Sequence, residues 1–183
     1  MMSKGRLIVI SGPSGVGKST IVKKIMEKIN PWYSISMTTR KKRDGEIDGV
    51  NYFFVNEEEF KKNIETGNLL EYATYNGNYY GTPKNQIDQK LSEGRDVLCE
   101  IEVKGAKQIK KLYPESILIF IMPPSIEKLR ERLLDRATED IDTIERRIKI
   151  AKEEMTQIDF YDYKIVNDNL ELAINEVLEI LTK

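Results

Sequence analysis

The chain contains no histidine and a single cysteine among its 183 residues. The lack of histidine excludes Ser-His-Asp and Cys-His nucleophile systems, and every zinc site built on imidazole. A single cysteine excludes an intramolecular disulfide and a thiolate zinc cage, and it is typical of a reducing compartment. Cys99 lies in the apolar run 97–99, which favours a buried core side chain over a nucleophile. Chemistry must therefore rest on Lys, Arg, carboxylates, hydroxyls and a hard metal ion.

The sequence also lacks a large net charge and any long apolar segment. The formal net charge is −1, so no global field favours nucleic acid or an acidic membrane surface. No apolar stretch is long enough to span a bilayer, and no apolar signal segment precedes residue 7. With 40% hydrophobic and 32% charged residues, we expect one soluble, cytoplasmic globular domain that binds neither nucleic acid nor membrane.

Residues 12–19 match the phosphate-binding pattern G-x-x-x-x-G-K-[ST] in full. An apolar run at 7–10 precedes the match, and apolar residues at helical spacing follow it at 20–26, which is the strand-loop-helix context that the motif requires. Glycines let successive backbone N–H groups point at phosphate oxygens, Lys18 reaches the β- and γ-phosphates, and Ser19 offers a hydroxyl to Mg²⁺. The motif predicts that the chain binds a nucleoside triphosphate.

The rest of the chain is typical of an α/β protein in which a parallel sheet is flanked by helices. A strand-rich insertion is expected over 36–82, between helical segments. Around and within it we expect a strand at 32–36, a loop at 37–51, a strand at 52–55, a helix from cap Asn56 to Gly67, and strands at 69–75 and 78–80 joined by the turn Asn76-Gly77. Beyond it we expect helices at 83–93, 104–112, 125–136 and 141–157, strands at 96–101, 117–121 and 163–166, and a last helix capped by Asn167 or Asp168.

Two further groups of charged residues fit a phosphoryl-transfer enzyme. Glu100 and Glu102 close the strand 96–101, where an enzyme with this loop needs an acid near the Mg²⁺ shell. Read alone, such acids are usually solvated. Arg132 and Arg136 are one helical turn apart, and arginines at 146–147 follow; they could stabilise a transferring phosphoryl group, or form a surface face paired with Glu131 and Glu145.

The insertion gathers arginines, phenols and one carboxylate. Arg40 and Arg43 can grip a phosphate, and the hydroxyls of Tyr52 and Tyr80 can complete its shell, although these tyrosines also suit a core. Glu71 is the carboxylate of this group, and a glutamate that is buried can accept two hydrogen bonds from a donor pair. Guanine offers such a pair through N1–H and its N2 amine, whereas adenine does not.

With these features, the chain resembles the guanylate kinases from end to end, as a stand-alone enzyme of bacterial type. The resemblance is carried by residues 12–20, 36–40 with Arg43, 48–54, Glu71, 77–82, 100–106, 123–125, the Arg132/Arg136 pair and 165–168. It implies the reaction ATP + GMP ⇌ ADP + GDP with Mg²⁺, and the same reaction on dGMP. It also implies a core (1–35, 83–135 and 158–183), a GMP-binding insertion (36–82) and a lid (136–157).

The resemblance assigns a role to each matching residue. The nucleotide-binding residues would be Gly12, Pro13, Ser14, Gly15, Val16, Gly17, Lys18, Ser19, Thr20 and, near the adenine, Asn167. The GMP-binding residues would be Ser36, Glu71 and Thr82 at the base, Arg40, Arg43, Tyr52 and Tyr80 at the phosphate, and Glu102 beside the nucleotide. Lys18, Arg136 and Arg147 would be catalytic, and Ser19 and Glu100 would serve the metal ion.

The sequence departs from the family pattern at two places, and three alternatives compete with it. Ala137 stands where the family usually has glycine, and glutamates stand at 100 and 102 where many relatives have aspartates.

A guanylate-kinase-like scaffold module is disfavoured by the intact Lys18 and Ser19. A kinase acting on a ribose bisphosphate is disfavoured by the base-binding set, and a switch GTPase by the absence of D-x-x-G and [NT]-K-x-D.

Overall fold

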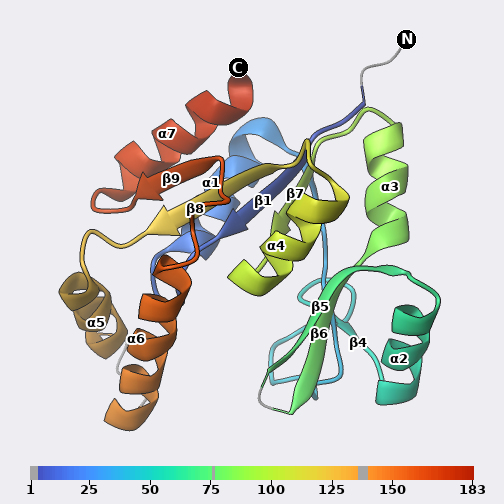
Figure 1. Ribbon diagram of the computed structural model, residues 1–183, viewed down its shortest axis with the longest axis horizontal. Coiled ribbons are helices and arrows are strands. Elements are labelled where there is room, and N and C mark those ends of the chain that lie inside the picture. The colour runs from blue at the N-terminus through green and yellow to red at the C-terminus, as the bar shows by residue number, and fades with distance from the viewer. Residues whose placement is uncertain (1–3, 76, 136–139) are drawn as a thin grey trace. The chain divides into compact units, whose positions relative to one another are not determined.

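The computed structural model describes residues 4–75, 77–135 and 140–183 (Figure 1). The chain divides into two compact units. The first unit takes the residues up to Ile8, 31–99 and 104–116, and the second unit takes 9–30, 100–103 and 117–183. The α/β fold with a parallel sheet flanked by helices agrees with the prediction.

The first sheet is built around the fully buried apolar strand that precedes the phosphate-binding motif. In order across the sheet, its strands are β2 (Trp32–Tyr33), β7 (Val97–Glu100), β1 (Leu7–Ser11), β8 (Ile117–Met122) and β9 (Tyr163–Val166). β2 pairs with β7 and β8 pairs with β9, both in parallel. Continuous apolar strands such as β1 and β8 are expected in a parallel sheet because helices cover both of its faces.

The second sheet lies within the first unit and comes from the segment 37–83. In order, its strands are β4 (Phe53–Phe54), β3 (Met37–Thr38), β6 (Asn78–Pro83) and β5 (Leu69–Tyr75). β5 and β6 form the long antiparallel hairpin in Figure 1, and β3 pairs antiparallel with β6 and parallel with β4. The ring of Phe60, on the helix beside this hairpin, stacks on Tyr79 at 5.2 Å between centroids and so covers one face of the sheet.

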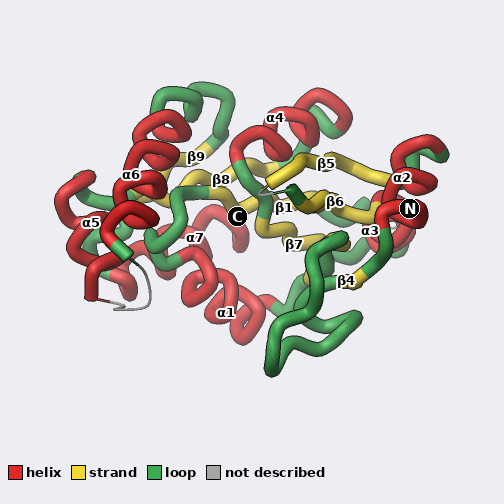
Figure 2. The backbone as a smooth tube through the Cα atoms, turned by 90° about the horizontal axis from the view of Figure 1, so that it is seen from below, coloured by secondary structure: helices red, strands yellow, loops and turns green. Residues whose placement is uncertain are grey.

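Seven helices occur among the described residues: α1 (Lys18–Ile29), α2 (Glu57–Glu65), α3 (Lys84–Ser92), α4 (Val103–Leu112), α5 (Ile126–Asp135), α6 (Ile141–Met155) and α7 (Leu170–Thr182). The predicted cap Asn56 is confirmed, because its side chain accepts a hydrogen bond from the Glu59 N–H at 2.8 Å. Within the second unit, α5 and α6 lie side by side, as do α1 and α7 (Figure 2). None of the helices in the described ranges is long and apolar enough to cross a membrane.

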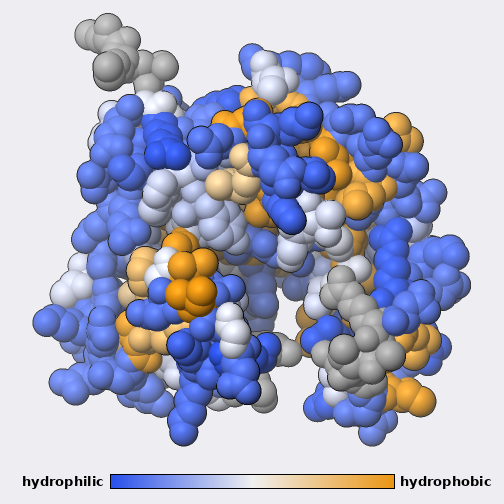
Figure 3. Space-filling model, turned by 180° about the vertical axis from the view of Figure 1, so that it is seen from behind, coloured by the Kyte–Doolittle hydropathy of each residue, from blue (hydrophilic) through white to orange (hydrophobic). Residues whose placement is uncertain are grey.

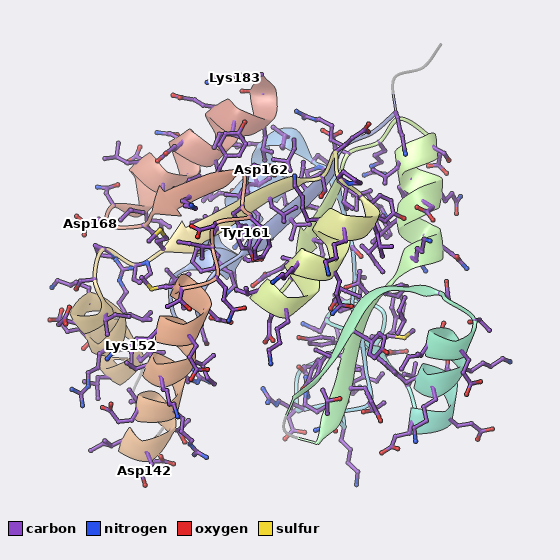
Figure 4. All side chains as sticks on the ribbon, viewed as in Figure 1. Asp142, Lys152, Tyr161, Asp162, Asp168 and Lys183 are labelled. Atoms are coloured by element: carbon purple, nitrogen blue, oxygen red, sulfur yellow. The ribbon has the colours of Figure 1, made fainter. Side chains whose placement is uncertain are left out.

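Buried side chains form the core of each unit. In the second unit, Ile21 and Ile25 of α1, Phe120 of β8 and Val177 of α7 are fully buried. Tyr161, on the connection between α6 and β9 (Figure 4), packs its ring against Phe120 at 5.1 Å between centroids. Each such side chain contributes roughly 1.5–3 kcal/mol through burial. The face seen in Figure 3 is mostly hydrophilic, with apolar side chains showing in separate groups.

Three local predictions are wrong. The strand expected at 32–36 stops at Tyr33, and the segment expected to be a loop over 37–51 contains β3. The cause is non-local, since Met37 and Thr38 are held extended by pairing with Gly81 and Tyr80 far along the chain. The last helix is capped by Asn169, whose side chain accepts from the Leu172 N–H at 3.1 Å, and not by the residues at 167 or 168.

Candidate functional site

The phosphate-binding motif forms a glycine loop between β1 and α1, as predicted. Gly12 has φ +151°, and a Cβ there would lie 2.4 Å from the carbonyl oxygen of Ile121. Gly17 has φ +99°, and a Cβ there would lie 2.6 Å from Nδ2 of Asn167. Both positions therefore require glycine, because a side chain would meet strained backbone and a close neighbour. The loop leads directly into the N-terminus of α1, where anions bind favourably.

Lys18 lies against the loop that it is predicted to serve. Its Nζ donates to the carbonyl oxygens of Gly12 at 2.5 Å and Pro13 at 3.1 Å. Burial lowers the pKa of the Lys18 ammonium, and three nearby carboxylates oppose that shift. Ordered by how strongly each one raises the pKa of Lys18, they are Glu100, Glu154 and Glu102. The loop thus holds a cation at the end of the buried strand, with acidic groups around it.

The predicted acids take up different environments. Glu100, the last residue of β7, is half-buried, and burial raises the pKa of its carboxyl although Lys18 opposes this. Glu102 is exposed. Glu154 on α6 was not predicted from the sequence; burial and then the charge of Glu102 raise the pKa of its carboxyl. Only its helical spacing toward the packed face of α6 could have signalled it. Among the described residues, no group of three or more acidic or cysteine side chains is arranged to hold a metal ion by itself.

Asn167 is buried beside the loop, directly after β9. Its Nδ2 donates to the carbonyl oxygen of Val16 at 2.7 Å, within the phosphate-binding motif. Arg132 of α5 donates from Nη2 to the backbone carbonyl of Asn167 at 2.9 Å. In the described structure, Oδ1 of Asn167 is buried without a hydrogen-bond partner. A buried acceptor of this kind is costly unless a ligand satisfies it.

The structure describes only some of the predicted lid residues. Arg147 lies half-buried on α6. Arg136 and Ala137 fall outside the described residues. Glu131 pairs with Lys128 at 2.6 Å, and Glu145 of α6 pairs with Arg130 of α5. Both glutamates thus form surface ion pairs with Lys128 and Arg130, whereas the alternative interpretation paired them with Arg132, Arg136 and the arginines at 146–147.

Apart from Glu102, which belongs to the second unit, the predicted acceptor residues belong to the first unit, and four of them lie side by side across its second sheet. Glu71 of β5 is directly opposite Thr82 of β6. Because Met37 is opposite Gly81, the same antiparallel register places Ser36 next to Thr82. In the same way, Met37 is beside Phe53 in parallel, so Tyr52 follows beside Ser36. Residues that pair across strands project to the same face. Four residues far apart in sequence thus form one row.

Glu71 is the buried acid of this row. It is 8% exposed, and its Oε1 accepts a hydrogen bond from Oγ1 of the fully buried Thr82 at 2.6 Å. Ser34 and Cys99 are buried nearby, and the charge of Glu71 adds to the burial that raises the pKa of the Cys99 thiol to about 12. Glu71 is therefore not a solvent-facing strand residue, and Cys99 is a core side chain, as the sequence predicts.

The next part of the face carries the predicted phosphate-binding side chains. The rings of Tyr52 and Tyr80 meet edge-on at 6.0 Å between centroids. The guanidinium of Arg40 lies 5.5 Å from the ring centre of Tyr52 and 5.6 Å from that of Phe54. Arg43 is exposed. Arg40 also pairs with Glu46, at 2.7 Å between Nη2 and Oε1, which the sequence analysis did not anticipate.

Comparison with known proteins gives one family over nearly the whole chain. The family model for guanylate kinase matches residues 4–183. A guanylate kinase of Enterococcus faecalis is 50% identical over 183 residues, which cover 99% of this chain and 90% of that protein. A guanylate kinase of Carboxydothermus hydrogenoformans is 51% identical over 183 residues, covering 99% and 89%.

Two solved structures extend the comparison to the fold. The crystal structure of guanylate kinase from Anaplasma phagocytophilum aligns with a TM-score of 0.78 at 32% identity, and covers 98% of this chain and 86% of that chain. The shikimate kinase of Bacteroides thetaiotaomicron aligns with a TM-score of 0.54 at 16% identity, covering 97% and 99%, which shows a likeness of fold alone. From the whole-chain family match and these relatives, the chain belongs to the guanylate kinase family.

Proposed function

We propose that this chain carries out the guanylate kinase reaction, ATP + GMP ⇌ ADP + GDP, with a donor site in its second unit and an acceptor site in its first. The observation that carries the proposal is the pairing of an intact phosphate-binding loop with a buried glutamate in a row of hydroxyl-bearing residues. Neither feature alone would define the reaction. Together they supply binding groups for a triphosphate and for a base that presents two donors.

At the donor site, the N–H groups of the loop and the ammonium of Lys18 bind the phosphates of ATP. Lys18 is held by two loop carbonyls, so it has only to turn from them to the β- and γ-phosphates. The oxygen donors fit Mg²⁺, which binds through one or two protein groups together with substrate phosphates and needs no cluster of three acids. Ser19 and Glu100 would hold it, and when bound it would neutralise charge on the phosphates.

Asn167 completes the donor site at the adenine. Its buried Oδ1 is satisfied when it accepts a hydrogen bond from the 6-amino group of adenine. Guanine has an oxygen at this position, so the same acceptor disfavours GTP as the phosphoryl donor. Nδ2 continues to hold the Val16 carbonyl, which couples base binding to the shape of the loop.

At the acceptor site, Arg40, Arg43, Tyr52 and Tyr80 bind the phosphate of GMP. The stacked and paired guanidinium of Arg40 is already oriented, so little side-chain entropy is lost on binding. Charge-assisted hydrogen bonds of this kind contribute roughly 1.5–3 kcal/mol each.

Glu71, Thr82 and Ser36 bind the guanine, and Glu102 is assigned to GMP by its match to the family motif. Glu71 accepts from N1–H and from the N2 amine, while Thr82 keeps the carboxylate in place. An adenine in this position would leave a buried carboxylate facing the lone pair of N1. GMP and dGMP are bound alike in this way, because these contacts are made to the base and not to the sugar.

The transfer itself needs no general base. The second pKa of the acceptor phosphate is about 6, so its oxygen is already anionic at neutral pH. The protein has to align the two phosphates and balance the charge of the transferring group. Lys18 serves this purpose together with Arg136 and Arg147. The single buried cysteine suits the reducing cytoplasm, where we place the reaction.

A coupled assay of ADP release with GMP, dGMP, AMP, CMP and UMP in parallel tests the proposal. We expect turnover with the two guanine nucleotides, and kcat/KM for AMP lower by on the order of 10⁴, the discrimination available to a site built around substrate donors. Equal turnover of AMP and GMP would contradict the assignment of the base-binding row.

A further inference from the structure

The side chain of Glu46 makes three hydrogen bonds to the two arginines of the acceptor site. Its Oε1 accepts from Nη2 of Arg40 at 2.7 Å, and its Oε2 accepts from Nη1 of Arg40 at 3.0 Å. The same Oε2 accepts from the backbone N–H of Arg43 at 2.8 Å. No motif drew attention to this glutamate, because it lies in a polar, basic segment where an acid is unremarkable.

Together, these contacts fix the guanidinium of Arg40 on several sides. Glu46 occupies the edge formed by Nη1 and Nη2, and Nη1 also donates to the carbonyl of Lys41 at 2.8 Å. The aromatic rings at 52 and 54 lie against the guanidinium. The Nε–H edge is not used by Glu46. A guanidinium can therefore bind a carboxylate at one edge and a phosphate at the other, since it has five N–H donors in a rigid plane.

Glu46 also gives the segment 40–46 its local shape. Its own N–H donates to the carbonyl of Arg43 at 3.2 Å, while its side chain takes the N–H of that residue. The turn is thus closed by the backbone and by the carboxylate together. The hydrogen bonds from the two arginines lower the pKa of the Glu46 carboxyl to about 2, so it stays ionised at neutral pH.

We propose that Glu46 is a positioning residue of the acceptor site, which holds Arg40 and the backbone of Arg43 in the geometry that binds the GMP phosphate. This inference rests on the proposed function. It differs from a competing possibility, in which the carboxylate imitates the phosphate and must be displaced. Positioning predicts that loss of the carboxylate weakens GMP binding, whereas competition predicts that it strengthens binding.

The test compares wild type with Glu46→Gln and with Glu57→Gln as a matched control. A glutamine has one acceptor oxygen, so it cannot keep all three hydrogen bonds. Glu57 is exposed on α2, and its pair with Lys61 at 3.2 Å touches none of the site residues. Calorimetry gives the affinities for GMP and for guanosine, and steady-state kinetics gives KM and kcat. Thermal unfolding shows whether each variant is folded. Glu46→Asp, which keeps the charge on a shorter side chain, is measured as a second variant at the same position.

We expect Glu46→Gln to raise the Kd and KM for GMP about tenfold, with kcat within about twofold and the affinity for guanosine unchanged. Glu46→Asp should fall between wild type and Glu46→Gln, and Glu57→Gln should match wild type. In an Arg40→Ala background, the effect of Glu46→Gln should largely disappear. An unchanged or tighter GMP affinity in Glu46→Gln, or an equal loss for guanosine, overturns the inference. A wild-type protein that forms no GDP from GMP overturns the proposed function instead, and is recognised before any variant is compared.

Discussion

Replacing Glu71 by glutamine tests the recognition of guanine at a single atom. The substitution keeps the size and planarity of the side chain but exchanges one acceptor oxygen for a donor. Thr82 can adapt, because its hydroxyl donates to an oxygen and accepts from an amide nitrogen equally well. The change therefore falls on the atoms that face the base and leaves the packing of β5 on β6 in place.

The magnitude follows from the burial of the carboxylate. At 8% exposure, solvent cannot compensate for a hydrogen bond that is lost. When the amide nitrogen of the glutamine faces the base, one charge-assisted hydrogen bond is lost and two N–H donors face each other. The remaining hydrogen bond to the base is no longer charge-assisted. We expect a loss of about 3–4 kcal/mol, which corresponds to roughly 10² to 10³ in kcat/KM for GMP. AMP should gain little, because Ser36 and Thr82 still surround the base.

The assay is the coupled release of ADP with GMP or AMP as acceptor, run on wild type and on Glu71→Gln. Affinity for ATP serves as the internal control and should not change. Thermal unfolding should show a variant that is folded, because the glutamine fits the same space. Wild-type kcat/KM for GMP in Glu71→Gln would refute the assignment of this residue to the guanine.

Other parts of the structure give further predictions. Arg40→Ala and Arg43→Ala should each weaken GMP binding by about tenfold or more and leave ATP affinity unchanged in calorimetric titrations, since each removes a charge-assisted contact; an equal loss for both ligands would count against an acceptor site. Asn167→Leu should raise KM for ATP but spare KM for GMP, and loss of GMP affinity instead would remove this residue from the donor site. Cys99, whose thiol pKa is raised to about 12, should resist iodoacetamide at pH 8 in the native protein and react once the chain is unfolded, as mass spectrometry would show. The pKa of Glu46 falls from its ordinary 4.5 to about 2 on folding, so as the pH falls the unfolded chain binds this proton before the folded chain does. The free energy of unfolding of wild type should therefore decrease between these two pH values by an amount that is absent in Glu46→Gln, as acid titrations of unfolding would show.

Local signals in the sequence were sufficient for much of this structure. The phosphate-binding loop is continuous in sequence, and its glycines, strand and helix are neighbours along the chain. The helix cap formed by Asn56 depends on a residue three positions away. The end of α3 depends on a single residue, Gly94, whose backbone is left-handed with φ +77°. Interactions of such short range are visible in a pattern, because the partners are near each other whatever the fold.

The features that the sequence did not reveal depend on partners far apart in the chain. β3 is two residues long and owes its existence to β6, more than 40 residues later. Glu154 reaches Lys18 only because α6 packs within the same unit, and acids are common on helices of this kind. Glu46 is close to Arg40 in sequence, but an acid among basic residues suggests only a solvated pair. The row formed by Tyr52, Ser36, Thr82 and Glu71 required the register of the whole sheet.

The most direct test of the central claim follows the γ-phosphate of labelled ATP in the presence of GMP. Wild-type protein should move the label to GDP in amounts equal to the ADP formed. Lys18→Ala should remain folded, with transfer slower by about 100-fold or more, because a preorganised charge is worth a few kcal/mol in the transition state. Label that appears as inorganic phosphate and not as GDP, or transfer by Lys18→Ala within tenfold of wild type, would contradict the account.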